Sequence, residues 1–309
     1  MEKKLYDVII VGAGPAGLSA AIYANRGNLN VLVIDKEMPG GKVVTTATVE
    51  NYPGYDYITG PDLAYKMYDQ CMKLGVEFIF DEVKNIDATQ KVKKVELNST
   101  TLEAKSIVIA TGMKNRTLNI PNEEKFFHRG ISYCAICDGA LYKNKVVTVI
   151  GSGRSAVEES MYLADIASHV NLISNKKEFK ADKKIVDKLS NFKNIKVYYG
   201  VDTLSFNGTD KLESITIREQ DSKKENQIKT DGAFIFIGFI PVTPTVNNQS
   251  ILDKETNFIK VNDKMETAIE GVFAAGDILT KHYRQITTAV SDGTIAALAI
   301  IEYINNEWK

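Results

Sequence analysis

Two stretches of the chain repeat one pattern, in which a short apolar strand leads through a glycine-rich turn into a helix and then a second strand. The first copy has strands at 6–11 and 30–34 around a turn at 12–17, and the second has strands at 145–150 and 169–173 around a turn at 151–156. A strand, a tight turn and a helix in this order are typical of a dinucleotide-binding βαβ unit. We therefore expect an α/β fold with two Rossmann-like dinucleotide-binding domains.

The first turn places glycine at each position where such a unit needs one. Gly12 permits the tight turn, Gly14 lets backbone amides approach a pyrophosphate, and Gly17 lets the helix pack against the strand. Asp35 follows the second strand 23 residues after Gly12, near the roughly 20-residue spacing of a ribose-binding acid. A glycine turn can also be purely structural, but the complete strand, turn, helix and strand favour a nucleotide site.

The second turn has Gly151 and Gly153 and ends in Ala156, which is small enough for the same helix packing. It either binds a nucleotide, as we expect, or is a copy that has lost its ligand. The residues after its second strand are Ser174 and Asn175, so neither an acid for NAD nor an arginine for the NADP 2′-phosphate stands there.

Lysines follow this strand, at Lys176, Lys177 and Lys180. They could supply a phosphate partner, although a lysine group just past a strand is more often a solvated surface. The preference of the second site between nucleotides is therefore left open by the residues.

Cys134 and Cys137 form the most informative motif of the chain, because two thiols separated by two residues can close a small ring that is readily reduced and formed again. A zinc site would need four ligands, and neither a second cysteine pair nor a histidine at zinc-finger spacing is present. We expect a redox pair and no metal. Asp138 could donate a proton to a leaving thiolate or cap a helix, and Cys71 fits a buried small hydrophobic residue.

Composition and length restrict the remaining classes of function. The 309 residues are enough for about two domains. The 38 basic and 39 acidic residues give no electrostatic footprint for nucleic acid or an anionic membrane. No apolar stretch approaches the roughly 20 residues that span a bilayer, and no cleavage site follows the first apolar run. We expect a cytoplasmic chain without nucleic-acid or membrane partners.

Further strands are predicted at 106–110, 231–238, 258–261 and 271–275, and a helix at 284–303. The strand at 106–110 is closed by Thr111 and Gly112. The simplest assembly inserts residues 116–244, as a domain carrying the cysteine pair, into a first domain built from residues 1–115 and 245–309.

With these residues in place, the chain resembles the low-molecular-weight bacterial thioredoxin reductases over nearly its whole length. Besides the first glycine turn, the resemblance is carried by PGGK at 39–42, ENYPG at 50–54, ATG at 110–112, SYCAICDG at 132–139, AAGD at 274–277 and YRQ at 283–285. The order of these segments matches as well.

The resemblance implies that FAD binds to the first domain. The residues that it assigns to FAD are Gly12, Gly14, Pro15, Ala16, Gly17, Asp35, Lys36, Gly41, Lys42, Asn51, Val83, Ala110, Thr111, Gly112, Gly276, Asp277, Arg284, Gln285 and Ile286. Asp35 would hold the ribose, Val83 would contact the adenine, and the residues after Gly276 would hold the ribityl chain and the ring.

The second domain would bind NADPH through Gly151, Gly153, Arg154, Ser155, Ala156, Lys176 and Lys180. Electrons would pass from NADPH through FAD and the Cys134–Cys137 disulfide to the disulfide of thioredoxin. Cys137 would be the sulfur nearer the flavin, with Asp138 assisting proton transfer. The resemblance also implies a homodimer and a rotation of the domains about connectors near 114–116 and 239–243.

The chain departs from the family pattern where Ser174, Asn175 and Lys176 replace the usual histidine and arginine pair, and where Lys180 replaces a later arginine. NADH or reduced ferredoxin therefore stay open as alternative donors to the same dithiol flavoenzyme. The preserved turn at 151–156 argues against ferredoxin, since a protein without a pyridine nucleotide has less reason to keep it. A flavin-bound redox sensor without turnover is a third hypothesis.

Overall fold

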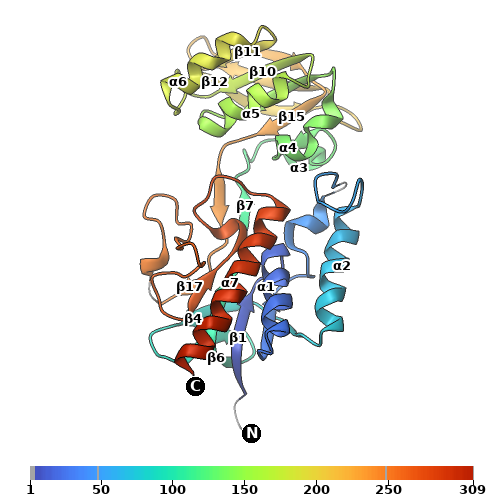
Figure 1. The fold of residues 1–309 in the computed structure, drawn as a ribbon. Coiled ribbons are helices and arrows are strands. Elements are labelled where there is room, and N and C mark those ends of the chain that lie inside the picture. The colour runs from blue at the N-terminus through green and yellow to red at the C-terminus, as the bar shows by residue number, and fades with distance from the viewer. Residues whose placement is uncertain (1–3, 47–48, 248, 309) are drawn as a thin grey trace. The chain divides into compact units, whose positions relative to one another are not determined.

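The computed structural model describes residues 4–46, 49–247 and 249–308. The chain divides into two compact units, which we call unit 1 (residues 1–114 and 240–309) and unit 2 (residues 115–239) (Figure 1). Both units have the mixed α/β character expected from the sequence. That unit 1 binds FAD and unit 2 binds a nicotinamide nucleotide stays a prediction.

Unit 1 is built on one large sheet with the strand order β17-β4-β5-β6-β1-β2-β3, and β18 pairs with β6. Its strands are β1 (Leu5–Val11), β2 (Val31–Asp35), β3 (Glu77–Phe80), β4 (Val83–Asp87), β5 (Lys93–Leu97), β6 (Thr101–Ile109), β17 (Thr245–Val246) and β18 (Val272–Ala274). The strands β3, β2, β1, β6 and β18 run parallel, whereas β5 is antiparallel to both β4 and β6. In the centre Val8, Ile9 and Ile10 are all fully buried, because a parallel strand covered on both faces is apolar without alternation.

The helices of unit 1 are α1 (Pro15–Arg26), α2 (Gly60–Lys73) and α7 (Ile286–Glu307), with short 3₁₀ turns η1 (Gly41–Thr45), η4 (Gln249–Ile251) and η5 (Gly276–Ile278). Pro15 lies in the first turn of α1, where its fixed φ suits a helix start. Helices α1 and α7 lie side by side (Figure 1), and a Cβ on Gly293 would come 2.1 Å from the carbonyl oxygen of Ala16. Only glycine permits so close an approach.

Helix α7 corrects the expectation that no apolar stretch of the chain approaches the length that spans a bilayer. Its 22 residues are long and apolar enough, by length and composition, to cross a membrane. A core helix passes the same test, and Gly293, Ala296 and Ile300 of α7 are buried in unit 1 beside Leu18 and Ala20 of α1. The apolar composition of α7 is thus accounted for in part by its packing on α1.

Unit 2 contains a five-stranded parallel sheet with the order β11-β10-β9-β15-β8 and a three-stranded antiparallel sheet β12-β13-β14. The strands are β8 (Ile131–Ser132), β9 (Val146–Ile150), β10 (His169–Ser174), β11 (Ile195–Tyr199), β12 (Val201–Asn207), β13 (Ser214–Glu219), β14 (Glu225–Lys229) and β15 (Gly232–Ile235). The helical segments are α3 (Glu123–Phe126), α4 (Ala135–Asp138), η2 (Gly139–Tyr142), α5 (Arg154–Ala164), α6 (Lys183–Val186) and η3 (Asp187–Asn191). Helix α5 packs on β9, β10 and β11.

The chain passes between the units along two short strands, β7 (Met113–Asn115) and β16 (Phe239–Pro241), which form a separate two-stranded sheet. The second junction lies between Phe239 and Ile240, a few residues before the boundary expected at 244–245. The reason is that the following segment is already tied into unit 1, where Val242 donates its N–H to Gly112 and β17 pairs with β4. Rotation about these connectors stays a prediction.

The strand expected at 258–261 is wrong. Ile259 forms only isolated bridges, to Leu252 and Leu279. The preceding residues fold into a turn around Asp253, whose Oδ1 accepts hydrogen bonds from the N–H groups of Glu255 and Thr256. An apolar segment of four residues can therefore be buried by loop contacts without a ladder.

Candidate functional site

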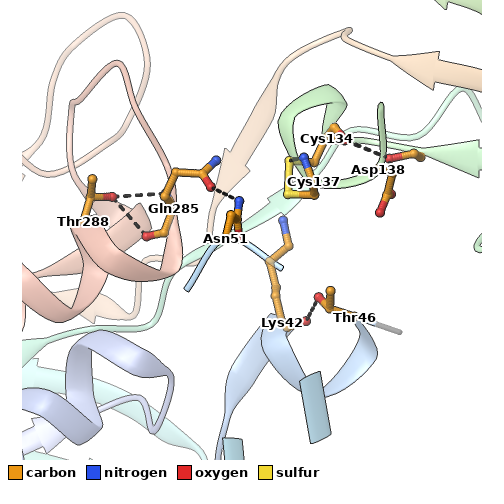
Figure 2. Close-up of a disulfide and its surroundings, with 9 residues drawn as sticks. Lys42, Thr46, Asn51, Cys134, Cys137, Asp138, Gln285 and Thr288 are labelled. Carbon is orange, nitrogen blue, oxygen red and sulfur yellow. Dashed lines mark hydrogen bonds between the residues drawn. A yellow bond between two sulfur atoms is a disulfide. The ribbon is translucent and has the colours of Figure 1, made fainter. Parts of the chain in front are cut away.

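Cys134 and Cys137 are joined in a disulfide, with their Cα atoms 5.3 Å apart (Figure 2). Cys134 caps the short helix α4, and its Sγ accepts the N–H of Cys137 at 3.2 Å. The Cys137 side is exposed, while Cys134 is half-buried. A pair with this spacing at an accessible helix start can be reduced and formed again without large backbone movement.

Asp138 is positioned by a residue to which the sequence assigned no role. The Ser132 hydroxyl donates to Asp138 Oδ2 at 2.6 Å and accepts the N–H of Cys134 at 3.0 Å. Ser132 lies at the end of β8 and is buried. It therefore fixes the carboxylate relative to the backbone of the cysteine pair, and its place inside the SYCAICDG segment is the only signal that could have indicated it.

The third cysteine is unsuited to redox chemistry. Cys71 is fully buried on α2, and its Sγ contacts the carbonyl oxygen of Leu18 at 3.5 Å. Burial raises the pKa of the Cys71 thiol to about 12, so the reactive thiolate is scarce near neutral pH. This agrees with its expected role as a small hydrophobic residue.

In unit 1 the first glycine turn is pressed against the neighbouring strand but is open on its other side. Gly12 has a φ of +108°, and a Cβ there would lie 2.4 Å from the carbonyl oxygen of Ala110. A Cβ on Gly17 would lie 1.8 Å from the carbonyl oxygen of Gly12, whereas nothing lies within 4 Å of a Cβ placed on Gly14. The backbone around Gly14 at the start of α1 is thus accessible to a phosphate group.

Asp35 lies at the end of β2 and is tied to this turn. Its Oδ2 accepts the N–H of Ala13 at 2.7 Å, and its Oδ1 accepts the N–H of Glu37 at 3.0 Å. Each carboxylate oxygen can accept more than one hydrogen bond, so Asp35 can still receive the hydroxyl groups of a ribose.

Unit 1 also contains, among its described residues, buried polar atoms that lack a hydrogen-bond partner, one of them in the C-terminal segment. In the described part of the chain, Asp277 Oδ1 and Thr111 Oγ1 are buried and have no hydrogen-bond partner. Arg284 donates Nη2 to the carbonyl oxygen of Leu279 at 3.1 Å. Buried polar atoms are nearly always satisfied in proteins, so Asp277 and Thr111 fit a site completed by a bound polar ligand.

Several residues that the sequence predicted for FAD are in contact. A Cβ on Gly41 would come 3.2 Å from the Cα of Gly14, and one on Gly276 would come 2.8 Å from the Cβ of Ala16. Asn51 donates Nδ2 to Gln285 Oε1 at 3.2 Å (Figure 2). Val83 instead packs with the core around β4, so its contact with an adenine stays a prediction.

The second glycine turn, in unit 2, has the same construction. A Cβ on Gly151 would lie 2.3 Å from the carbonyl oxygen of Phe236, and nothing lies within 4 Å of a Cβ on Gly153. Ala156 is fully buried where the first turn has its third glycine. Helix α5 starts directly after this turn, at Arg154.

The lysine segment after β10 lies against this turn. Lys180 donates its N–H to the carbonyl oxygen of Ser152 at 2.7 Å, and the Ser152 hydroxyl donates to Asn175 Oδ1 at 2.8 Å. Both Lys176 and Lys180 are exposed. These contacts place the lysine segment beside the turn at 151–156. Its contact with a nucleotide phosphate stays a prediction.

Arg154, expected to contact a nucleotide, is held by two carboxylates. Its guanidinium lies 2.9 Å from Glu158 and 3.7 Å from Asp182. Sequence reasoning missed both acids, although the spacing of four residues on one helix could have indicated the Arg154–Glu158 pair.

Comparison with known proteins places this geometry in a family. Residues 6–293 match the model of the pyridine nucleotide-disulphide oxidoreductases. A thioredoxin reductase of Ureaplasma parvum is 48% identical over 309 residues and is covered, like this chain, to 100%, and further curated proteins of that name are 40–42% identical.

Solved structures agree. Thioredoxin reductase from Streptococcus pyogenes is 39% identical, with a TM-score of 0.92 and coverage of 97% of this chain and 98% of that one. A ferredoxin-flavin thioredoxin reductase from Clostridium acetobutylicum is 31% identical, with a TM-score of 0.53 and coverage of 98% and 99%. The family resemblance and the fold class expected from the sequence are thereby confirmed, and this chain belongs to the pyridine nucleotide-disulphide oxidoreductase family.

Proposed function

We propose that this chain reduces the disulfide of thioredoxin, with FAD as its cofactor and Cys134 and Cys137 as its redox pair. The observation that carries the proposal is the accessible Cys134–Cys137 disulfide in a chain with two open dinucleotide turns. The full-length similarity to curated thioredoxin reductases supports the same function.

Unit 1 fits FAD by its own geometry. The amides around Gly14 would hold the pyrophosphate, Asp35 the ribose, and Asp277 and Thr111 would gain partners for their buried oxygen atoms. When bound, FAD supplies the two-electron chemistry that connects a reduced nicotinamide to a disulfide. We propose the remaining FAD contacts as the resemblance assigns them.

The dithiol step follows from the two cysteines alone. In the reduced pair, one thiolate attacks a sulfur of the thioredoxin disulfide, a bond forms between the proteins, and the other thioredoxin sulfur leaves as a thiolate. The second cysteine then attacks the mixed disulfide, which restores the Cys134–Cys137 bond and releases reduced thioredoxin. We propose Cys137 for the exchange with the cofactor, as the resemblance implies. Asp138, which follows it and is held by Ser132, is the proposed proton donor.

NADPH is the donor that we propose. The second turn keeps an open backbone at Gly153, and the segment carrying Lys176 and Lys180 lies against it. Reduced ferredoxin is the second candidate, favoured by Ser174 and Asn175 and by the similarity to a ferredoxin-flavin thioredoxin reductase. NADH requires the same turn without a phosphate partner.

We further propose a cytoplasmic homodimer that binds neither nucleic acid nor membranes. The even balance of 38 basic and 39 acidic residues supports the exclusion of nucleic acid. The burial of one face of α7 in unit 1 supports the exclusion of a membrane.

Anaerobic reduction of the purified yellow protein tests the proposal. NADPH, NADH and reduced ferredoxin are added in turn while the flavin absorbance is followed, with Cys134→Ser as the control variant. We expect rapid bleaching by NADPH and, after thioredoxin is added, turnover only in the protein with both cysteines. Bleaching by ferredoxin alone would overturn the donor, and bleaching without turnover on thioredoxin would overturn the function.

A further inference from the structure

The loop that carries Asp277 is fastened at both ends by a single carboxylate. Asp292, in the second turn of α7, accepts the Lys281 ammonium at 2.6 Å and the N–H of Gly276 at 3.1 Å, both on its Oδ2 atom. The side chains of Asp292 and Lys281 are 14% and 17% exposed. One oxygen atom thus ties the start and the end of residues 276–281 to α7.

Lys281 also faces the acid in the middle of this loop. Its Nζ lies 3.9 Å from Asp277 Oδ1, the buried oxygen that has no hydrogen-bond partner in the described part of the chain. At this distance the lysine supplies charge without satisfying the oxygen atom. The oxygen is left available to a donor that the protein does not provide.

We propose that Lys281 and Asp292 are positioning residues for the flavin site, which hold the Asp277 loop in place and keep the Asp277 carboxylate charged so that it can accept a hydroxyl group of FAD. The inference rests on the proposed FAD site in unit 1 and assigns a role to two residues outside the motifs that predicted that site.

The charged residues around Asp277 determine the direction in which each variant should shift the pKa of Asp277. Burial raises the pKa of Asp277, Asp292 raises it further, and Lys281, Lys42 and Arg284 lower it. Lys281 is the strongest of the three cations. Lys42 faces Asp277 from η1, Lys281 from its own loop, Arg284 from the segment just before α7, and Asp292 from α7. Removing the Lys281 charge should therefore raise the pKa of Asp277, and removing the Asp292 charge should lower it.

If Lys281 and Asp292 only held the loop in place, without affecting the charge of Asp277, a different result would be expected. Loosening the loop from either end would weaken FAD binding by the same factor at every pH. A role in charging Asp277 instead moves the pH at which FAD affinity falls, because a protonated carboxyl group is a poorer acceptor for the cofactor hydroxyl. The two variants should move this midpoint in opposite directions.

The experiment measures FAD release from the diluted holoprotein by flavin fluorescence, from pH 9 down to the lowest pH at which each variant stays folded. We expect the affinity of the wild-type chain to fall as the pH drops through the pKa of Asp277. In Lys281→Met the midpoint should rise by about one pH unit. At a pH below both midpoints, this corresponds to an affinity for FAD roughly tenfold weaker than that of the wild-type chain. In Asp292→Asn, which keeps an acceptor oxygen, the midpoint should fall, and Lys281→Arg should restore wild-type behaviour.

A uniform loss of affinity in both variants, or midpoints that move in the same direction, would overturn the inference and leave the FAD site intact. If Lys281→Met fails to fold, the direction of the midpoint in Asp292→Asn decides by itself. A wild-type chain that binds no FAD would overturn the proposed function together with the inference.

Discussion

The glycine turns of the two units share a backbone but differ in what stands beside it. In each, the first glycine is pressed against a backbone carbonyl, which a Cβ at that position would approach to 2.4 Å in unit 1 and 2.3 Å in unit 2, and the second glycine is open. The last residue of the following strand differs. Asp35 accepts the N–H of Ala13 in the first turn through its carboxylate, whereas Ser174 is hydrogen-bonded through its hydroxyl to the Ser152 hydroxyl of the second turn. Steric demands thus fix the turn, while the ligand that it selects is set by side chains some 20 residues later.

Variants of the cysteine pair should affect the reduction of thioredoxin without affecting the nucleotide sites at the two turns. Cys134→Ser or Cys137→Ser should lower the rate of thioredoxin reduction by about a thousandfold or more, because neither thiol can complete the exchange alone. Reduction of the flavin by the donor should continue in both variants. Stopped-flow absorbance and a thioredoxin assay measure the two steps, and loss of flavin reduction would show that the turns and the dithiol are not separable.

The closest contact in the first turn predicts the largest effect on stability. Gly17→Ala places a carbon 1.8 Å from the carbonyl oxygen of Gly12, so the helix must shift, at a cost of roughly 3 kcal/mol in the free energy of unfolding. Gly14→Ala is the matched control, because its Cβ would meet nothing within 4 Å. Urea unfolding of both variants measures the difference, and equal stabilities would contradict the steric account.

The lysine segment allows a test of which nucleotide the second turn selects. If Lys176 and Lys180 receive a 2′-phosphate, changing both to glutamine should remove about 2 kcal/mol of binding, or raise KM for NADPH roughly 30-fold. KM for NADH should change little. Lys177→Gln is the control, since Lys177 already pairs with Asp221 at 3.1 Å. A lysine segment that is only a solvated surface would leave KM for NADPH unchanged in the double variant.

The parts of the molecule that the sequence predicted are those with local causes. Glycines at Gly12, Gly14 and Gly17 follow from the steric needs of one turn, and the Cys134–Cys137 ring closes over three residues. The wrong strand at 258–261 had the right apolar character, but its N–H groups bond to the carbonyl oxygens of Ile251 and Ile278 instead of a ladder.

The contacts that could not be predicted join residues that are far apart in the chain, or residues whose spacing follows no recognisable sequence pattern. Lys281 contacts Asp292 because the loop turns back onto the helix that follows it. Arg154 contacts Asp182, which lies 28 residues later in the chain, just past the lysine segment. Ser132 holds Asp138 across the start of α4. Each contact depends on side-chain direction after folding, which hydrophobic periodicity does not carry.

The smallest effect is expected from an acid placed beside the second turn, at Asn175, the residue that follows the Asp35-equivalent Ser174. Asn175→Asp would place a carboxylate near the ribose of the nicotinamide nucleotide, where it can accept a 2′-hydroxyl but repels a 2′-phosphate. KM for NADPH should rise about tenfold, equivalent to roughly 1.4 kcal/mol, while KM for NADH should stay level or fall. Asn175→Gln is the neutral control, and steady-state kinetics with both nucleotides measure the change. If the aspartate leaves the ratio of the two KM values unaltered, position 175 does not read the 2′ group, and the likeness of the two turns ends at their backbone.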